Sequence, residues 1–325
     1  MSKFKVALVH TIFPELDIEY GEIEKADGEL IVAKDQTEEE MIRVVKDADA
    51  IVTVYAEVTE KIIDAAEKCK IIVRTGIGTN NIDINAATKR GIYVANVPDY
   101  CFDEVSDHAI ALALALSRKI VLLNQKVKRG EWDFEGAQPI LAMRGQTFGL
   151  MGFGNIPKFV AKKAKVFGFN VIAYDPYVKQ EDAKALGVKL VDLETLLKES
   201  DFVSLHAPLT EETMHVINEK TLKLMKPTAF LINTARGPLV DEKAICKALK
   251  EKWIAGAGLD VLEQEPPVAD NPLFTLYNVI LTPHAAFTSD KSEVALRVKA
   301  MQEAIRGALG EKPKNWVNRR AMESK

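Results

Sequence analysis

The chain has 325 residues, a formal net charge of -4 at pH 7, 47% hydrophobic residues and 28% charged residues. A chain of this length exceeds one ordinary hydrophobic core, so we expect about two domains. The average composition and the slight negative charge exclude a protein that binds nucleic acid or anionic lipid through bulk positive charge.

The cysteines and the hydrophobic segments favour a cytoplasmic protein. Cys69, Cys101 and Cys246 lie far apart without a C-x-x-C pair, so we expect neither a disulfide framework nor a metal centre. The first residues, MSKFKVALVH, predict a β-strand rather than an export signal. The most apolar run, AIALALALS, is far shorter than the roughly 20 residues that a membrane-spanning helix needs.

Short β-branched segments alternate with amphipathic helical segments, which is typical of parallel sheets covered by helices. A first series of predicted strands ends near Pro98 and comprises KVALVH, DAIVTVYA, IIVRTG and IYVANV. One long helix is predicted next, over DEVSDHAIALALALSRKIVLLNQKV at 103–127. Its apolar residues lie on almost every face, which predicts burial between layers.

A second series of predicted strands follows, with amphipathic helices between them. It comprises TFGLMG, NVIAYD, GVKLV, DFVSLH, AFLINT, AGAGLDV and NVILTP. This pattern predicts an α/β fold with a doubly wound parallel sheet of about seven strands. The last predicted helix, SDKSEVALRVKAMQEAIRGAL, comes after this series is complete, so we expect it to return to the first domain.

The stretch MGFGNIPKF places Gly152 and Gly154 at the first two positions of G-x-G-x-x-G, but Pro157 replaces the third glycine. The third glycine serves close packing of helix on strand, whereas the first two permit the turn and the approach of pyrophosphate. Proline is tolerated in the first turn of a helix, where its missing N–H has no acceptor. We therefore expect the helix start, with Asn155 and Ile156, still to bind phosphate.

Asp175 ends the next predicted strand, 175 − 152 = 23 residues after the first glycine. A carboxylate about 20 residues after that glycine binds the ribose hydroxyls of NAD and repels a 2'-phosphate. The pattern therefore favours NAD over NADP, although Lys179 softens that preference. A strand–turn–helix without any ligand is the alternative interpretation.

Three further strand ends carry Arg236 in NTARG, Glu265 in LDVLEQEPP and His284 in LTPHAAF. Each residue also has a structural alternative: Arg236 could cap a helix, Glu265 could lie on a solvated turn, and His284 could be a core histidine. Together they suit the reduction of a 2-oxo acid. Arg236 would hold the carboxylate and polarise the carbonyl, and His284 would exchange the proton. Glu265 would fix the orientation of the imidazole.

These motifs, in this order and spacing, resemble the D-isomer-specific 2-hydroxyacid dehydrogenase family over nearly the whole chain. The resemblance implies an NAD-binding domain over 101–289, inserted into a smaller flavodoxin-like substrate-binding domain over 1–100 and 290–325. It implies an active site in the cleft, a homodimer formed through the nucleotide domains, and catalytic roles for Arg236, Glu265 and His284.

The same resemblance assigns the other site residues. The residues that it implies for cofactor binding are Gly152, Gly154, Asn155, Ile156, Asp175, His206, Pro208, Thr213, Thr234, Ala235, Arg236, Asp260 and His284. Those that it implies for substrate binding are Gly76, Ile77, Gly78, Tyr100, Arg236 and His284. A tight turn after a strand is an equally good explanation of the glycines near residue 77.

The substrate and one alternative function stay open. Glyoxylate, hydroxypyruvate, pyruvate and branched 2-oxo acids all fit the motifs, and Arg74 is either a contact for a second acidic group or a surface residue. The segment NVPDYCFDEVSDHAIALALA also resembles C-terminal-binding proteins, for which the alternative is an NAD(H)-sensing interaction protein. That alternative is disfavoured because the chain has no extended tail.

Overall fold

The structure is a computed structural model that describes residues 3–323. The chain divides into two compact units. Unit 1 combines the residues up to Tyr100 with those from Ser289 onward, and unit 2 is the continuous segment Cys101–Thr288. Each unit contains one sheet in which all strand pairs are parallel.

The sheet of unit 1 has the strand order β2-β1-β3-β4-β5, which is the flavodoxin-like order. Its strands are β1 (Lys5–Leu8), β2 (Glu29–Val32), β3 (Ala50–Thr53), β4 (Ile71–Arg74) and β5 (Tyr93–Asn96). Every residue of β3 and β4 is buried, as expected for central strands covered on both faces. The predicted series lacked β2, because this half-exposed edge strand has no continuous β-branched run.

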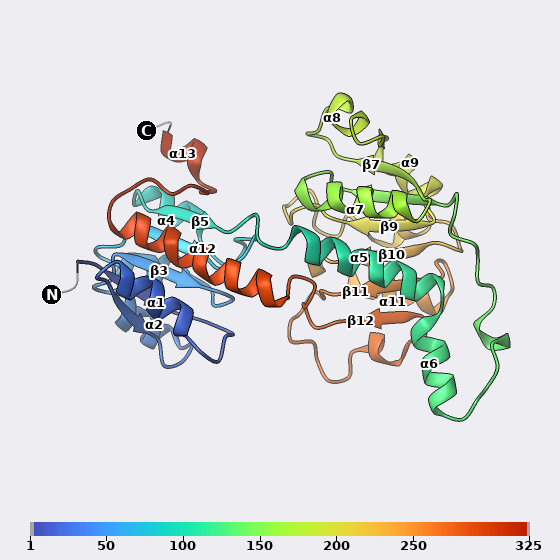
Figure 1. Ribbon diagram of the computed structural model, residues 1–325, viewed down its shortest axis with the longest axis horizontal. Helices are drawn as coiled ribbons and strands as arrows, with labels where there is room; N and C mark the ends of the chain where they lie inside the picture. Colours follow the sequence, from blue (N-terminus) through green and yellow to red (C-terminus); the bar gives the residue numbers. More distant parts are fainter. Residues whose placement is uncertain (1–2, 324–325) are drawn as a thin grey trace. The chain divides into compact units, whose positions relative to one another are not determined.

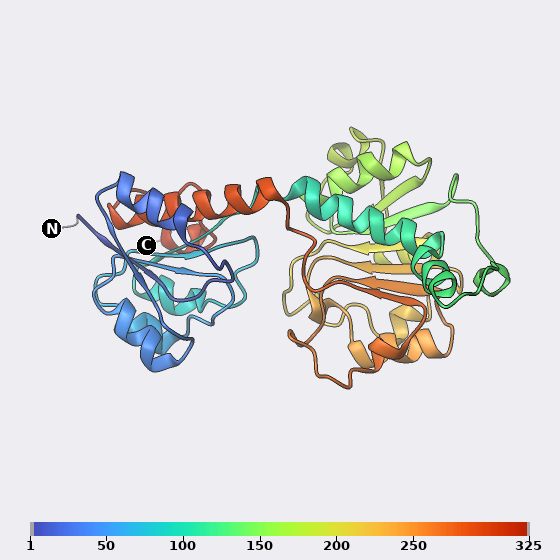
Figure 2. The same ribbon diagram turned by 60° about the horizontal axis from the view of Figure 1, so that its bottom comes forward.

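Helices cover both faces of this sheet (Figures 1 and 2). The long C-terminal helix α12 (Asp290–Ala308) lies beside α1 (Asp17–Lys25) on one face. The other helices are α2 (Glu38–Val45), α3 (Glu60–Ala65), α4 (Ile84–Lys89) and α13 (Arg319–Glu323). Helix α12 packs on β1, β3 and β4, which confirms the predicted return of this segment.

Unit 2 contains a seven-stranded sheet with the order β12-β11-β10-β9-β6-β7-β8, which confirms the predicted doubly wound sheet. The strands are β6 (Thr147–Met151), β7 (Asn170–Tyr174), β8 (Lys189–Leu190), β9 (Phe202–Leu205), β10 (Phe230–Asn233), β11 (Gly256–Leu259) and β12 (Val279–Leu281). Strands β7 and β8 follow β6 toward one side of the sheet, and β9 then lies on the other side of β6, so the strand order reverses between β6 and β9. That is the switch point at which such folds bind ligands.

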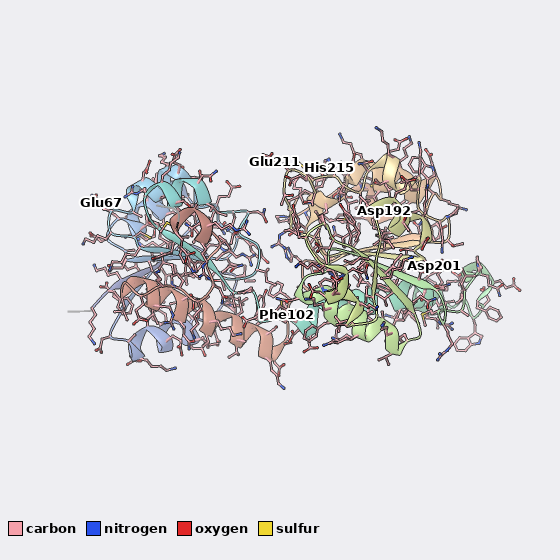
Figure 3. The ribbon with its side chains drawn as sticks, turned by 90° about the horizontal axis from the view of Figure 1, so that it is seen from above. Glu67, Phe102, Asp192, Asp201, Glu211 and His215 are labelled. Carbon is pink, nitrogen blue, oxygen red and sulfur yellow. The ribbon has the colours of Figure 1, made fainter. Side chains whose placement is uncertain are left out.

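Figure 2 shows helices on both faces of the unit 2 sheet. They are α5 (Phe102–Ser117), α6 (Ile120–Lys128), α7 (Asn155–Val166), α8 (Gln180–Lys184), α9 (Leu193–Glu199), α10 (Glu219–Leu222) and α11 (Glu242–Lys250). Short 3₁₀ turns lie at Glu135–Ala137, Gly237–Leu239 and Pro272–Thr275. Helix α9 follows Asp192, labelled in Figure 3, whose side chain accepts the N–H of Thr195 at 2.9 Å.

The prediction of one long helix over 103–127 is wrong. Lys119 has a φ of 56°, a left-handed conformation that separates α5 from α6. Helix α5 has a buried face, whereas α6 has no buried residue. The continuous apolar pattern therefore covers two helices in different environments.

Candidate active site

Six strands of unit 2 end at one edge of the sheet, and the predicted site residues follow them. Gly152 follows β6, Asp175 follows β7, and His206 follows β9. Arg236, Asp260 and His284 come at or soon after the ends of β10, β11 and β12. Since the carboxyl ends of parallel strands lie at the same edge, the fold gathers these residues where open α/β sheets bind ligands.

The turn after β6 depends on two glycines for different reasons. Gly152 has a φ of +92°, and a Cβ there would lie 2.9 Å from the backbone N of Ala207. Only glycine therefore fits that position. Gly154 is the N-cap of α7, and a Cβ at this residue would meet nothing within 4 Å. Pro157 is the third residue of α7, which confirms its predicted place in the first turn.

Asp175 lies beside this turn. Its Oδ2 accepts the N–H of Phe153 at 2.8 Å, and its Oδ1 accepts the N–H of Tyr177 at 2.8 Å. These bonds fix the half-buried carboxylate at the end of β7, next to the glycine-rich turn. A carboxylate in this place suits the recognition of ribose hydroxyls.

The loops after β9 and β10 carry polar side chains, some of which make local hydrogen bonds. Burial lowers the pKa of His206 to about 3, so its imidazole is neutral at pH 7, and Nε2 lies 2.9 Å from Oγ of Ser204. Thr213 donates from Oγ1 to the carbonyl of Pro208 at 2.7 Å, which closes the segment after His206. Among residues 3–323 the buried hydroxyl of Thr234 has no hydrogen-bond partner.

These features fit a dinucleotide. The first turn of α7 offers backbone N–H groups that have no intrahelical acceptor. Gly154 leaves open space at that helix start. The unpartnered hydroxyl of Thr234 would gain a partner from a bound polar group, because an unsatisfied buried hydroxyl costs about 1–3 kcal/mol.

The loop that carries Arg236 is held by local hydrogen bonds. The side chain of Asn233 donates to the carbonyl of Arg236 at 2.8 Å and accepts the N–H of Ala235 at 3.0 Å. The next residue, Gly237, lies so close to the following loop that a Cβ would be 1.8 Å from the carbonyl oxygen of Leu262. This glycine therefore lets the loops after β10 and β11 meet.

His284 and Glu265 form a short polar contact at this edge. Nδ1 of His284 lies 2.6 Å from Oε2 of Glu265, and Oε1 of Glu265 accepts the N–H of Leu262 at 3.0 Å. Burial is the largest single influence on the pKa of Glu265 and opposes ionisation, whereas the hydrogen bond and charge of His284 favour ionisation. Leu262 and the charge of Arg236 act in the same direction, so the pKa of Glu265 is lowered. The carboxylate is therefore ionised at neutral pH, and its contact with Nδ1 fixes the orientation of the imidazole.

The backbone of His284 is strained and supported. Its φ of 52° lies in the left-handed region, which is unusual for a residue other than glycine. The carboxylate of Asp260, only 2% exposed, accepts the N–H groups of Ala285 and Ala286, each at 2.9 Å. The N–H of His284 donates to the carbonyl of Asp260 at 2.7 Å. Asp260 thus fixes the segment that presents the imidazole.

Two residues outside the predicted site belong to this network. Thr282 donates from Oγ1 to Oδ1 of Asp260 at 2.6 Å, and Nε2 of His108 lies 2.9 Å from the same hydroxyl. The position of Thr282, two residues before His284 at the same strand end, is a signal that could have found it. His108 lies on α5, 174 positions away, and its pattern on that helix gave no such signal.

Another histidine–carboxylate pair lies on the segments after β9 and β11. His215, labelled in Figure 3, lies 3.2 Å from Glu263, and Glu263 also accepts the N–H of Glu242 at 2.6 Å. Within residues 3–323 no three histidine, cysteine or acidic side chains gather as metal ligands. The same residues include no helix with the length and apolar character needed to cross a membrane.

The predicted substrate residues near position 77 lie in unit 1, on the loop after β4. The carbonyl of Gly76 accepts the N–H of Val97 at 2.8 Å, and the carbonyl of Ile77 accepts the side-chain N–H of Asn96 at 2.6 Å. The N–H groups of Ile77 and Gly78 donate to no described residue. Successive backbone N–H groups without an acceptor in the protein can bind an anion when they point to the same side. Tyr100 is the last residue of this part of unit 1.

Comparisons with known proteins agree with this arrangement. Residues 110–286 match the family described as D-isomer specific 2-hydroxyacid dehydrogenase, NAD binding domain. A glyoxylate reductase from Thermococcus litoralis is 46% identical over 87% of this chain and 88% of its own length. A D-3-phosphoglycerate dehydrogenase from Methanocaldococcus jannaschii is 44% identical over 90% of this chain and 56% of its own length.

A solved structure shows the same likeness over nearly the whole chain. The D-lactate dehydrogenase from Aquifex aeolicus, complexed with NAD and lactic acid, has a TM-score of 0.84 and 32% identity, and covers 96% of this chain and 98% of its own. Fold, strand-end residues and relatives agree, and the chain belongs to the D-isomer-specific 2-hydroxyacid dehydrogenases, NAD-dependent enzymes that interconvert 2-oxo acids and D-2-hydroxy acids.

Proposed function

We propose that the protein reduces glyoxylate, or a 2-oxo acid of similar size, with Arg236, Glu265 and His284 as its catalytic residues. The contact of 2.6 Å between Nδ1 of His284 and Glu265 carries this proposal, because it aligns an acid–base group at the ligand-binding edge of the sheet. The glyoxylate reductase from Thermococcus litoralis supports the choice of substrate.

Each residue has a chemical task. NADH, when bound, supplies the hydride that adds to the carbonyl carbon. Arg236 would bind the substrate carboxylate and polarise the carbonyl with its permanently charged guanidinium. Nε2 of protonated His284 would give its proton to the oxygen that gains negative charge. Glu265 would stabilise the imidazolium and keep Nδ1 engaged. In the reverse reaction the neutral imidazole accepts the proton.

For the cofactor, we assign the phosphates to the turn at Gly152 and Gly154 and to the helix start at Asn155 and Ile156. Asp175 would bind the ribose hydroxyls and thereby favour NADH over NADPH, with Lys179 as the residue that weakens this preference. We assign the nicotinamide end to the loops after β9, β10 and β11, through His206, Pro208, Thr213, Thr234, Ala235 and Asp260.

For the substrate, we assign its carboxylate to the N–H groups of Ile77 and Gly78, with Gly76 shaping the turn. The support is that both N–H groups donate to no described residue. Tyr100 completes the proposed set. The domain roles follow: unit 1 binds substrate and unit 2 binds NAD.

We also propose that two copies associate through unit 2, in the cytoplasm. After α5 the chain runs through α6 and along the outside of unit 2 before it enters β6 (Figure 1). Trp132 and Phe134 on this segment are 88% and 63% exposed. Two large aromatic side chains exposed two residues apart support this choice, because contiguous exposed apolar surface marks interaction sites whereas a single exposed apolar residue does not. Three free cysteines are compatible with a reducing compartment.

A turnover assay with NADH tests the substrate. Glyoxylate, hydroxypyruvate, pyruvate and a branched 2-oxo acid are compared at equal concentrations, each with NADH and with NADPH. We expect glyoxylate to give the highest kcat/KM and NADH to be the better donor. A strong preference for the branched acid would refute the small-substrate assignment. Tight NADH binding without any oxidation would instead support an NAD(H)-sensing interaction protein.

A further inference from the structure

We propose that Arg74 is a positioning residue whose guanidinium, packed against the Gly76–Gly78 loop, strengthens the binding of the substrate carboxylate by that loop. Arg74 is the last residue of β4, and the sequence alone is compatible with either a ligand contact or a surface position. It is 8% exposed, so it is not a surface residue. The inference rests on the proposed function, because it requires the loop to bind a carboxylate.

The side chain of Arg74 folds back over its own loop. A Cβ on Gly76 would lie 1.2 Å from Nη1 and 2.4 Å from Cζ of Arg74. The guanidinium therefore fills the space that any other residue at position 76 would need. Gly76 also has a φ of +144°, so it combines a left-handed turn with room for the cation.

A second contact holds the guanidinium from the neighbouring strand end. Cζ of Arg74 lies 5.6 Å from the centre of the ring of Tyr55, which follows β3. The backbone N–H of Tyr55 donates to Nδ1 of His10 at 3.1 Å, so three strand ends of unit 1 fix this cation. Burial lowers the pKa of His10, so its imidazole is neutral at pH 7 and does not compete for the anion.

The guanidinium lies over Gly76, which directly precedes Ile77 and Gly78, the residues whose N–H groups we assign to the carboxylate. Gly76 is bonded directly to Ile77, and the carbonyls of both residues are tied to Val97 and Asn96. A positive charge in a poorly solvated position attracts an anion more strongly than the same charge in water. This attraction acts on every 2-oxo acid, because it acts on the carboxylate that all of them share.

The test compares steady-state kinetics of wild type with two neutral variants, Arg74→Met and Arg74→Gln, and with Arg74→Lys. Glyoxylate and NADH are the substrates, or the acid of the panel that is turned over fastest. We expect the neutral variants to raise KM by about tenfold or more while kcat changes by less than about threefold. The reason is that the guanidinium attracts the carboxylate equally in the bound substrate and in the transition state, so its loss weakens binding without slowing the bound substrate's reaction. Arg74→Lys should restore part of the loss.

Arg43→Met is the matched control, because it removes the same charge from an exposed site on α2. It should leave KM unchanged. Circular dichroism and NADH titration show that each variant is folded and binds cofactor. An unchanged KM in both neutral variants would overturn the inference, as would a fall in kcat with KM unchanged.

Competitive inhibition separates this role from recognition of a second acidic group. Oxamate carries one carboxylate and oxaloacetate carries two. We expect the Ki values of both to rise by the same factor in Arg74→Met. A rise confined to oxaloacetate would overturn the inference and make Arg74 the contact for the second carboxylate. If none of the 2-oxo acids makes wild type oxidise NADH, the proposed function fails as well. If wild type turns over normally and the Arg74 variants have a normal KM, only the role of Arg74 is refuted.

Discussion

Glu265 and His284 show how neighbours set the state of the pair that we propose as catalytic. Burial alone would favour a neutral carboxyl group, but its contacts lower the pKa of Glu265 instead. The carboxylate is thereby charged at neutral pH and holds one nitrogen of the imidazole. Asp260 holds the strained backbone of His284 from the other side. The imidazole is thus oriented by its side chain and by its backbone.

Replacing Glu265 with glutamine should lower kcat/KM by roughly tenfold or more, because the imidazole loses the charge that stabilises its protonated form. Because folding lowers the pKa of Glu265 below its ordinary 4.5, its contribution to stability is complete above that value and is lost as pH falls through the folded pKa. Urea unfolding should show Glu265→Gln less stable than wild type at pH 7, with the difference shrinking below pH 4.5.

The matched control for this prediction is Glu263→Gln, which changes the neighbouring carboxylate that lies beside His215. It should leave kcat/KM close to wild type. Equal kinetics for wild type and Glu265→Gln would remove the carboxylate from the account.

Asp175 has two tasks in one side chain. Its carboxylate closes the glycine-rich turn through Phe153, and we assign to it the ribose hydroxyls. Asp175→Ala should therefore weaken NADH binding and narrow the preference for NADH over NADPH. Dissociation constants of both cofactors measured by fluorescence check this. An unchanged ratio would mean that the ribose is recognised elsewhere; Asp192→Ala, at the cap of α9, controls for loss of a carboxylate.

The site residues at strand ends were predictable because a parallel sheet brings the carboxyl ends of its strands together. Arg236, Asp260 and His284 are such residues. The hydrogen bond from His108 to Thr282 was not predictable, because it joins a helix to a strand 174 positions away. Such a contact depends on how helix α5 packs, which periodicity along one helix does not determine.

At the scale of elements, helix α7 shows how a departure from a motif is absorbed. Pro157 replaces the third glycine. It is the third residue of the helix, where a backbone N–H would have no intrahelical acceptor, so its missing N–H costs no hydrogen bond. The ring of Pro157 is buried and occupies space that a glycine would leave free for closer packing of the helix on the strand. The start of α7, to which we assign the phosphates, still begins at Asn155.

Pro157→Gly should therefore keep or improve NADH affinity while lowering the free energy of unfolding by about 1 kcal/mol, since glycine makes the unfolded chain more flexible. Isothermal titration with NADH and urea unfolding measure the two effects. Loss of NADH binding in a folded variant would show that the proline, and not the helix N-terminus, forms the phosphate site.

Element boundaries were the least predictable feature of the fold. The seven strands of unit 2 were recognisable because most are buried and rich in branched residues. The break between α5 and α6 was not, since lysine at position 119 gives no sign of a positive φ. Strand β2 was missed because its partly exposed residues lack the pattern of a buried strand.

At the scale of the whole molecule, the C-terminal segment completes the fold begun by the N-terminus. Arg297 on α12 donates from Nε to the buried carboxylate of Glu19 on α1 at 2.8 Å, and this contact raises the pKa of Arg297. A buried ion pair of this kind costs several kcal/mol when one partner is removed. Unit 1 is a compact unit made from both ends of the chain.

Trp132→Ser tests the proposed dimer. The indole is 88% exposed, so its removal should not destabilise the isolated chain, but it should weaken association if this segment forms the interface. Size-exclusion chromatography with light scattering should show a dimer for wild type and a larger monomer fraction for the variant. Tyr177→Ser, 90% exposed on the same unit, is the control. A monomeric wild type at micromolar concentration would refute the dimer.

The measurement that tests the central claim most directly is the single-turnover rate of NADH oxidation in His284→Ala beside wild type, with NADH binding followed in the same samples. We predict that the rate constant falls by about 100-fold to 10,000-fold, as expected when a general acid is removed, while the dissociation constant of NADH stays within about threefold. A rate close to wild type in a variant that still binds NADH would contradict the account, because another group would then supply the proton.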